Sequence, residues 1–146
     1  PILKAGKAEP GDRVNFADGY PFLIVSEASL ANLNDRLVER GAEPVPMNRF
    51  RPNFVVQGCG AFAEDTWPRF TIGNVLFRAG GPCGRCAVTT TDQVTGERGL
   101  EPLRTLGEYR RNAADRTSVD FGQNLIHVTK SGSVRVGDEV RLVPDL

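Results

Sequence analysis

Residues 21–41 have the sequence PFLIVSEASLANLNDRLVERG, which predicts a buried strand running directly into an amphipathic helix. The four large apolar residues near its start are typical of a strand with both faces covered. Ser26 is a residue type that caps helices, because its side-chain oxygen accepts a hydrogen bond from an N–H group of the first turn. Leucines then recur at helical spacing until Gly41, a common helix stop. We therefore expect a strand over 21–25 and a helix over 27–40.

The rest of the chain consists of short apolar segments separated by glycine and proline. Gly73-Asn74 is typical of a two-residue hairpin turn. We expect strands over 54–57, 70–72, 75–78, 87–90 and 125–129, β-type segments on either side of Gly137-Asp138, a second helix over 103–111, a glycine-rich turn over 79–86 and irregular chain over 1–11. Short strands linked by tight turns favour a mainly β (α+β) fold: a closed or nearly closed barrel with two or more short helices.

Length and composition restrict the class of protein. The chain has 146 residues, of which 40% are hydrophobic and 25% charged, as in a single folded domain. Lys+Arg and Asp+Glu both number 18, so the basic excess of a nonspecific nucleic-acid binder is absent. No apolar run approaches the roughly 20 residues that span a bilayer. An odd cysteine count, three, argues against a disulfide scaffold and favours a reducing compartment.

The motif Cys83-Gly84-Arg85-Cys86 is the first candidate for chemistry. Its cysteines fit half of a zinc site, which Cys59 and His127 would have to complete. They also fit a redox dithiol, although such a pair normally opens a helix. A third reading is a single thiolate ligand for a soft metal, and a fourth is a pair of small buried residues. Arg85 beside Cys86 favours a function, because a nearby cation lowers the pKa of a thiol.

Three polar turns are further candidates. Residues 48–53, NRFRPN, hold two arginines, whose planar groups suit phosphate or carboxylate. Taken alone, this segment is better explained as a solvated loop whose arginines pair with Glu43 or Glu64. The turn over 16–21 contains Asp-Gly, which is ordinary turn chemistry. Residues 121–124, FGQN, place two amides at the head of an expected strand.

Taken together, seven blocks resemble one family. In order they are DGYPFLIVSEASL (18–30), NRFRPN (48–53), AEDTW (63–67), RCAVTTTD (85–92), EPL (101–103), FGQN (121–124) and VGDEV (136–140). Their order and spacing resemble the MOSC domain, the carboxy-terminal domain of molybdenum cofactor sulfurases, from about Gly11 to the end. The branch they resemble most holds the bacterial YcbX proteins and the mitochondrial amidoxime-reducing components.

The resemblance implies a molybdenum cofactor bound in a β-barrel and an oxidoreductase that reduces N-hydroxylated compounds such as amidoximes and hydroxylamino bases. It implies that the Cys86 thiolate is the metal ligand and the catalytic group. The other cofactor contacts that it implies are Asp18, Gly19, Tyr20, Arg51, Asn53, Gly84, Arg85 and Asn124. Asn124 departs from the family pattern, since the mitochondrial relatives have tyrosine there.

The resemblance also implies partners and context. We expect a small N-hydroxylated substrate, a ferredoxin-like or cytochrome b5-like electron donor, and neither nucleic acid nor membrane. Family members carry an upstream β-rich domain, so we expect 1–146 to be a single MOSC domain and a fragment of a longer protein, in the bacterial cytoplasm. The alternative is a sulfur-carrier or cofactor-binding domain of a sulfurase-like protein, in which pyridoxal phosphate would bind only an upstream domain.

Overall fold

The computed structural model describes residues 2–4, 13–15 and 22–144. Within these residues the chain forms nine strands, two α-helices and three short 3-10 helices. The strands are β1 (Ile2–Lys4), β2 (Arg13–Asn15), β3 (Phe22–Ser26), β4 (Phe54–Gln57), β5 (Arg69–Ile72), β6 (Val75–Arg85), β7 (Val119–His127), β8 (Ser133–Arg135) and β9 (Val140–Leu142). The helices are α1 (Glu27–Glu39), α2 (Leu103–Tyr109), η1 (Met47–Arg49), η2 (Ala63–Thr66) and η3 (Ala87–Thr90).

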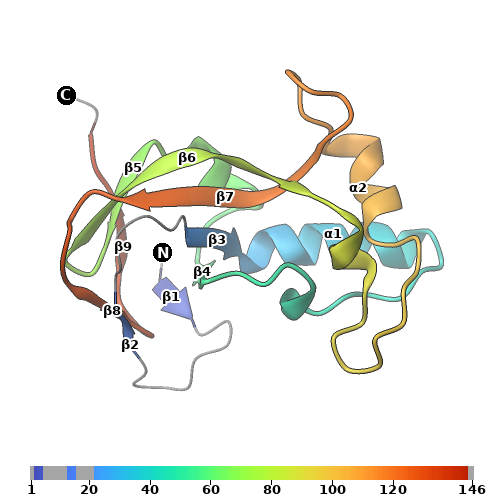
Figure 1. The fold of residues 1–146 in the computed structure, drawn as a ribbon, viewed down its shortest axis with the longest axis horizontal. Coiled ribbons are helices and arrows are strands. Elements are labelled where there is room, and N and C mark those ends of the chain that lie inside the picture. The colour runs from blue at the N-terminus through green and yellow to red at the C-terminus, as the bar shows by residue number, and fades with distance from the viewer. Residues whose placement is uncertain (1, 5–12, 16–21, 145–146) are drawn as a thin grey trace.

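Seven strands form one sheet in the order β1-β4-β3-β7-β6-β5-β9, and β2 pairs with β8 in a second sheet. Neighbouring strands are antiparallel, except for β3 and β4, which are parallel. Figure 1 shows β6 and β7 as long neighbours, with the helices toward one end of the molecule and β8 and β9 at the other. The fold is mainly β, with a nearly closed barrel sheet and two α-helices, which confirms the predicted fold class.

Strand β3 divides its apolar side chains between two cores. Phe22 and Ile24 belong to a core built mainly from the other strands of the sheet. Leu23 and Val25 belong to a second core, which includes the buried leucines of α1 and α2. Because successive side chains of a strand point to opposite faces, two covered faces require an uninterrupted apolar run. This arrangement explains the stretch from which the strand was predicted.

A buried carboxylate closes the junction between β3 and α1. Ser26 is the N-cap of α1, as predicted, and its hydroxyl oxygen accepts a hydrogen bond from the N–H of Ser29 at 3.0 Å. Glu64 is 1% exposed and accepts hydrogen bonds from the Ser26 N–H and from the hydroxyl groups of Ser26 and Ser29. Burial raises the pKa of Glu64 above its ordinary value of 4.5, and these hydrogen bonds only partly oppose the shift.

Glu64→Gln is expected to change how stability depends on pH. Since burial raises the pKa of Glu64 above 4.5, the folded state holds more protons than the unfolded state between pH 4.5 and the raised value. The free energy of unfolding should therefore fall as pH rises through that window, and the glutamine variant should lack this fall. Urea denaturation of both proteins from about pH 4 to about pH 8 measures it. Identical pH dependence in the two proteins would contradict the raised pKa.

Three predicted segments differ from the structure. Residues 79–86 are not a turn, because β6 continues to Arg85 and stays paired with β7 across two register shifts. Residues 87–90 are not a strand, because the N–H and the hydroxyl of Thr89 both donate to the Cys86 carbonyl and close the turn of η3. Within the segment 1–11, predicted as irregular, Ile2–Lys4 is a strand that pairs with β4.

Candidate functional site

Cys86 directly follows the last residue of β6 and precedes η3. Its backbone carbonyl accepts hydrogen bonds from the N–H of Thr89 at 3.1 Å and from the hydroxyl of Thr89 at 2.9 Å. Cys86 is exposed, whereas Cys83 is half-buried and packs against the second core. A strand end and a tight turn therefore present one of the two thiols to solvent.

The Cys86 side chain borders a pocket of about 300 Å³, here called the thiol pocket. Its lining residues are Leu23, Arg49, Phe50, Arg51, Gly84, Arg85, Cys86 and Thr89. Among these described lining residues three carry a guanidinium group and none carries a carboxylate. The thiol pocket therefore combines a soft metal ligand with positive charge.

Arg85 is held by backbone carbonyls from two other elements. Its Nε donates to the Phe121 carbonyl at 2.8 Å, and its Nη1 donates to the Phe50 carbonyl at 3.0 Å. Its Nη2 is buried and has no hydrogen-bond partner among the described residues. Burial lowers the pKa of the Arg85 guanidinium, and electrostatic interaction with the nearby Cys83 and Cys86 side chains opposes that shift. Arg85 thus joins β6, β7 and the chain before β4, and within the part of the chain that the structure describes its Nη2 is left to donate to another group.

Arg85→Lys is expected to lower the free energy of unfolding by about 1–2 kcal/mol. A lysine ammonium is a compact, strongly hydrated group and cannot reproduce the two hydrogen bonds that the planar guanidinium makes to Phe121 and Phe50. Urea denaturation measures the change, with Arg104→Lys on the exposed face of α2 as the matched control. If Arg85→Lys and Arg104→Lys had the same free energy of unfolding, the two hydrogen bonds of Arg85 would make no measurable contribution to stability.

The NRFRPN segment reaches the thiol pocket through its arginines. Arg51 is exposed, has a backbone φ of 53° and lines the pocket. Asn53 has a different role in the structure: its side-chain oxygen accepts from the Leu23 N–H at 2.8 Å, and its own N–H donates to the Leu23 carbonyl at 3.0 Å. The Asn53 side-chain oxygen therefore binds the backbone of β3. The predicted contact between Asn53 and a cofactor would have to be made by the side-chain NH2 group.

The other predicted site residues fall in three groups. Gly84 lines the thiol pocket next to Arg85 and Cys86. Asn124 is half-buried on β7 opposite Leu23 of β3, and it is not among the lining residues. Asp18, Gly19 and Tyr20 lie outside the described residues.

Two of the readings left open for the Cys-x-x-C motif lose support. Among the described residues no group of three His, Cys, Asp or Glu side chains could hold a metal ion, so a zinc site is not assembled there. His127 is instead buried, with its Nδ1 2.9 Å from the Thr129 carbonyl. Cys83 lies within β6, whereas the first cysteine of a redox dithiol normally opens a helix, and both thiols are free in the structure.

The contacts implied by the resemblance leave out four lining residues: Leu23, Arg49, Phe50 and Thr89. Arg49 and Phe50 belong to the NRFRPN segment, so a signal for them was present. Thr89 gave no such signal, because it was predicted on a strand, where it would not turn back toward Cys86. Leu23 was predicted only as a core residue.

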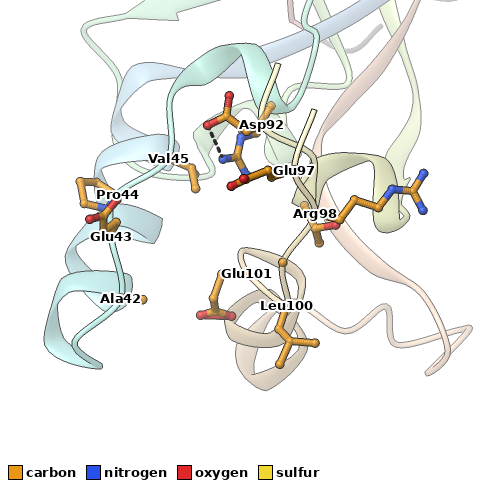
Figure 2. Close-up of a pocket in the computed structure, with 12 residues that line it drawn as sticks. Ala42, Glu43, Pro44, Val45, Asp92, Glu97, Arg98, Leu100 and Glu101 are labelled. Atoms are coloured by element: carbon orange, nitrogen blue, oxygen red, sulfur yellow. Dashed lines mark ion pairs between the residues drawn. The ribbon is translucent and has the colours of Figure 1, made fainter. Parts of the chain in front are cut away.

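A second cleft, here called the side cleft, adjoins the thiol pocket and shares Arg49 with it. Its volume is about 340 Å³, and it lies between the chain that follows α1 and the segment before α2 (Figure 2). Its lining residues are Ala42, Glu43, Pro44, Val45, Arg49, Thr90, Asp92, Glu97, Arg98, Gly99, Leu100 and Glu101. Arg49 Nη2 is 3.7 Å from Asp92 Oδ2, and Arg49 Nη1 donates to the Thr89 carbonyl at 3.4 Å. One arginine therefore stands between the two spaces.

A family model described as the MOSC domain matches residues 11–141. The chain belongs to the MOSC domain family. It is 41% identical over 140 residues to the human mitochondrial amidoxime-reducing component 1, an alignment that covers 92% of this chain and 40% of that protein. It is 44% identical over 134 residues to the mitochondrial amidoxime reducing component 2 of Bos taurus, covering 88% and 38%. This MOSC chain thus spans about two fifths of the length of the curated relatives it matches.

The fold comparison agrees with the family. The crystal structure of YiiM from Geobacillus stearothermophilus superposes with a TM-score of 0.59 at 14% sequence identity, covering 91% of this chain and 61% of that one. At this identity the likeness concerns the fold alone, which supports the barrel architecture of this MOSC domain.

The predicted bacterial cytoplasmic location is wrong. The curated relatives are named as mitochondrial proteins. The prediction rested on unpaired cysteines, which indicate reducing surroundings and do not distinguish one reducing compartment from another. In the described part of the chain, no helix has both the length and the apolar character needed to cross a membrane.

Proposed function

We propose that this MOSC domain binds a molybdenum cofactor for the reduction of N-hydroxylated compounds, with Cys86 as the protein ligand of the metal. The observation that carries the proposal is the exposed Cys86 thiol in a pocket lined by three arginines. Molybdenum held by a dithiolene is thiophilic, and a pterin phosphate is an anion that guanidinium groups neutralise. The names of the curated relatives, amidoxime-reducing components, support the substrate class.

The residues of the thiol pocket fit such a cofactor. Cys86 would supply the sulfur ligand, and Arg51 would neutralise the phosphate or hydrogen-bond the pterin. The buried Nη2 of Arg85, for which the described residues offer no partner, would gain an acceptor from an anionic group in the pocket. When bound, the cofactor supplies the two-electron chemistry that removes oxygen from nitrogen. Leu23 and Phe50 contribute apolar walls that reduce the access of water.

Several parts of the proposal rest on the family resemblance. They are contacts from Asp18, Gly19, Tyr20, Asn53 and Asn124, an electron donor of the ferredoxin-like or cytochrome b5-like class, and an upstream β-rich domain. The catalytic role of Cys86 is a proposal of the same kind.

The test is reduction of benzamidoxime by protein produced in a host that makes the cofactor. Turnover with an artificial electron donor should scale with the molybdenum content of different preparations. Protein that holds molybdenum but reduces no N-hydroxylated compound would refute the reductase assignment. Cofactor binding would then be the part of the proposal that survives.

A further inference from the structure

The turn that carries Cys86 is linked to the NRFRPN segment on both sides of the cysteine. Arg85, the residue before Cys86, donates from Nη1 to the Phe50 carbonyl at 3.0 Å. Arg49, the residue before Phe50, donates from its own Nη1 to the Thr89 carbonyl at 3.4 Å. Thr89 in turn donates to the Cys86 carbonyl through its N–H and its hydroxyl. Each segment therefore sends one arginine to a backbone carbonyl of the other.

The two arginines differ in how their side chains are supported. Arg85 also donates from Nε to the Phe121 carbonyl at 2.8 Å, so two carbonyls fix its guanidinium plane. Arg49 makes the longer hydrogen bond, and its second contact is an ion pair. Its Nη2 lies 3.7 Å from Asp92 Oδ2, the pair that Figure 2 marks with a dashed line. The direction of the Arg49 guanidinium therefore depends on Asp92.

Asp92 is fixed by the loop that follows the Cys86 turn. Its Oδ1 accepts hydrogen bonds from the N–H groups of Val94 at 2.8 Å and Thr95 at 3.1 Å. Its own N–H donates to the Glu97 carbonyl at 2.8 Å. The two hydrogen bonds to Oδ1, with a smaller effect of the Arg49 charge, lower the pKa of Asp92. The carboxylate thus uses one oxygen for its loop and turns the other toward Arg49.

We infer that Arg49 is a positioning residue for Cys86 and that Asp92 keeps Arg49 in place. This inference rests on the proposed function in one respect: the two groups kept in register are the proposed metal ligand, Cys86, and the proposed phosphate contact, Arg51. Groups that orient a metal ligand without touching the metal govern how firmly the metal is held. The competing role for Arg49 is that of a charge that attracts an anion in the thiol pocket directly.

Asp92→Asn separates these two roles by the sign of its effect. Asparagine keeps a side-chain oxygen that can accept from Val94 and Thr95, but it loses the charge that attracts Arg49. If Arg49 positions Cys86, the variant loosens the turn and lowers the molybdenum content. If Arg49 acts only as a charge, the loss of a competing carboxylate leaves the turn unchanged and strengthens the attraction for the anion.

The first measurement is amide hydrogen exchange in the cofactor-free chain, followed by nuclear magnetic resonance. Arg49→Ala and Asp92→Asn should each speed the exchange of the Thr89 amide about fivefold or more. The amides of Gly96 and Val128, which donate to the carbonyls of Asp92 and Leu76, should stay within about twofold of the native rates. That pattern would show that the Cys86 turn opens while the neighbouring loop and the rest of the sheet stay closed.

The second measurement is molybdenum content in protein from a cofactor-producing host. Arg49→Ala and Asp92→Asn are both expected to lower it about threefold or more. Arg49→Lys keeps the charge but lacks the planar group whose two nitrogens reach Thr89 and Asp92, so it should restore the metal only in part.

Matched controls for both measurements are Arg78→Ala and Asp115→Asn. Arg78 is exposed on β6 and forms no ion pair with any described residue. Asp115 is an exposed carboxylate whose Oδ1 accepts from the N–H and hydroxyl of Thr117, as Asp92 accepts within its own loop. Neither control should change the exchange of Thr89 or the metal content by more than about twofold.

Unchanged exchange of Thr89 in both variants would overturn the inference. It would also be overturned by a molybdenum content that rises in Asp92→Asn, or by full restoration of the metal in Arg49→Lys. The exchange measurement needs no cofactor. A native chain that takes up no molybdenum would therefore refute the proposed function, and the exchange of Thr89 would still decide whether Arg49 holds the Cys86 turn.

Discussion

Cys86→Ser is expected to lower the molybdenum content of the purified protein at least about tenfold. Serine keeps the size and exposure of the side chain but replaces a soft sulfur ligand with a hard, protonated oxygen. Because the side chain is exposed and the turn at Cys86 is held through its backbone carbonyl, the substitution should leave the fold unchanged. Elemental analysis of protein from a cofactor-producing host measures the metal, and thermal unfolding checks the fold.

Cys83→Ser is the matched control for that experiment. Cys83 lies three residues earlier, within β6, but it is half-buried against the second core and is not among the lining residues of the thiol pocket. Its replacement should leave the molybdenum content within about twofold of the native value. If both variants, or neither, lost the metal, the assignment of Cys86 as the single thiolate ligand would be wrong.

Local signals explain why part of the fold was predictable. The strand and helix around Ser26 were predicted correctly because the apolar run, the cap and the leucine spacing all lie within one stretch of chain. The Gly73-Asn74 hairpin was correct for the same reason. The extension of β6 to Arg85 was missed because its glycines suggest a turn, whereas pairing with β7, which is distant in sequence, continues past them through two register shifts. Strand β7 likewise begins at Val119, six residues earlier than expected, through that same pairing.

The site was predictable only in its residue types. Cys86 and Arg51 lie 35 positions apart, and each alone had an ordinary structural explanation. They meet because β4 lies next to β3, β3 next to β7, and β7 next to β6, an order that no local pattern reveals. The resemblance of seven ordered blocks supplied the connection instead. The side cleft was not foreseen, because its walls come from segments with no periodic signal.

Gly122→Ala is expected to lower the free energy of unfolding by about 2–4 kcal/mol. Gly122 has a φ of 90°, which disfavours any residue with a Cβ atom. A Cβ atom there would also lie 2.9 Å from both Leu23 Cδ1 and Val25 Cγ2 and 3.1 Å from the Ile24 carbonyl oxygen. These contacts lie on β3, which pairs with β4 on one side and with β7 on the other and therefore has little freedom to move. Urea denaturation measures the loss.

Gly81→Ala separates the two causes of that loss. Gly81 has a similar φ of 109°, but a Cβ atom there would meet nothing within 4 Å. It should therefore show only the backbone cost, about 1 kcal/mol. Equal losses at the two positions would mean that β3 does not pack closely on β7. A larger loss at Gly122 would show that its close contact with β3 contributes to stability. The same contact bears on the thiol pocket, because the carbonyl of the preceding residue, Phe121, accepts the hydrogen bond that holds Arg85 there.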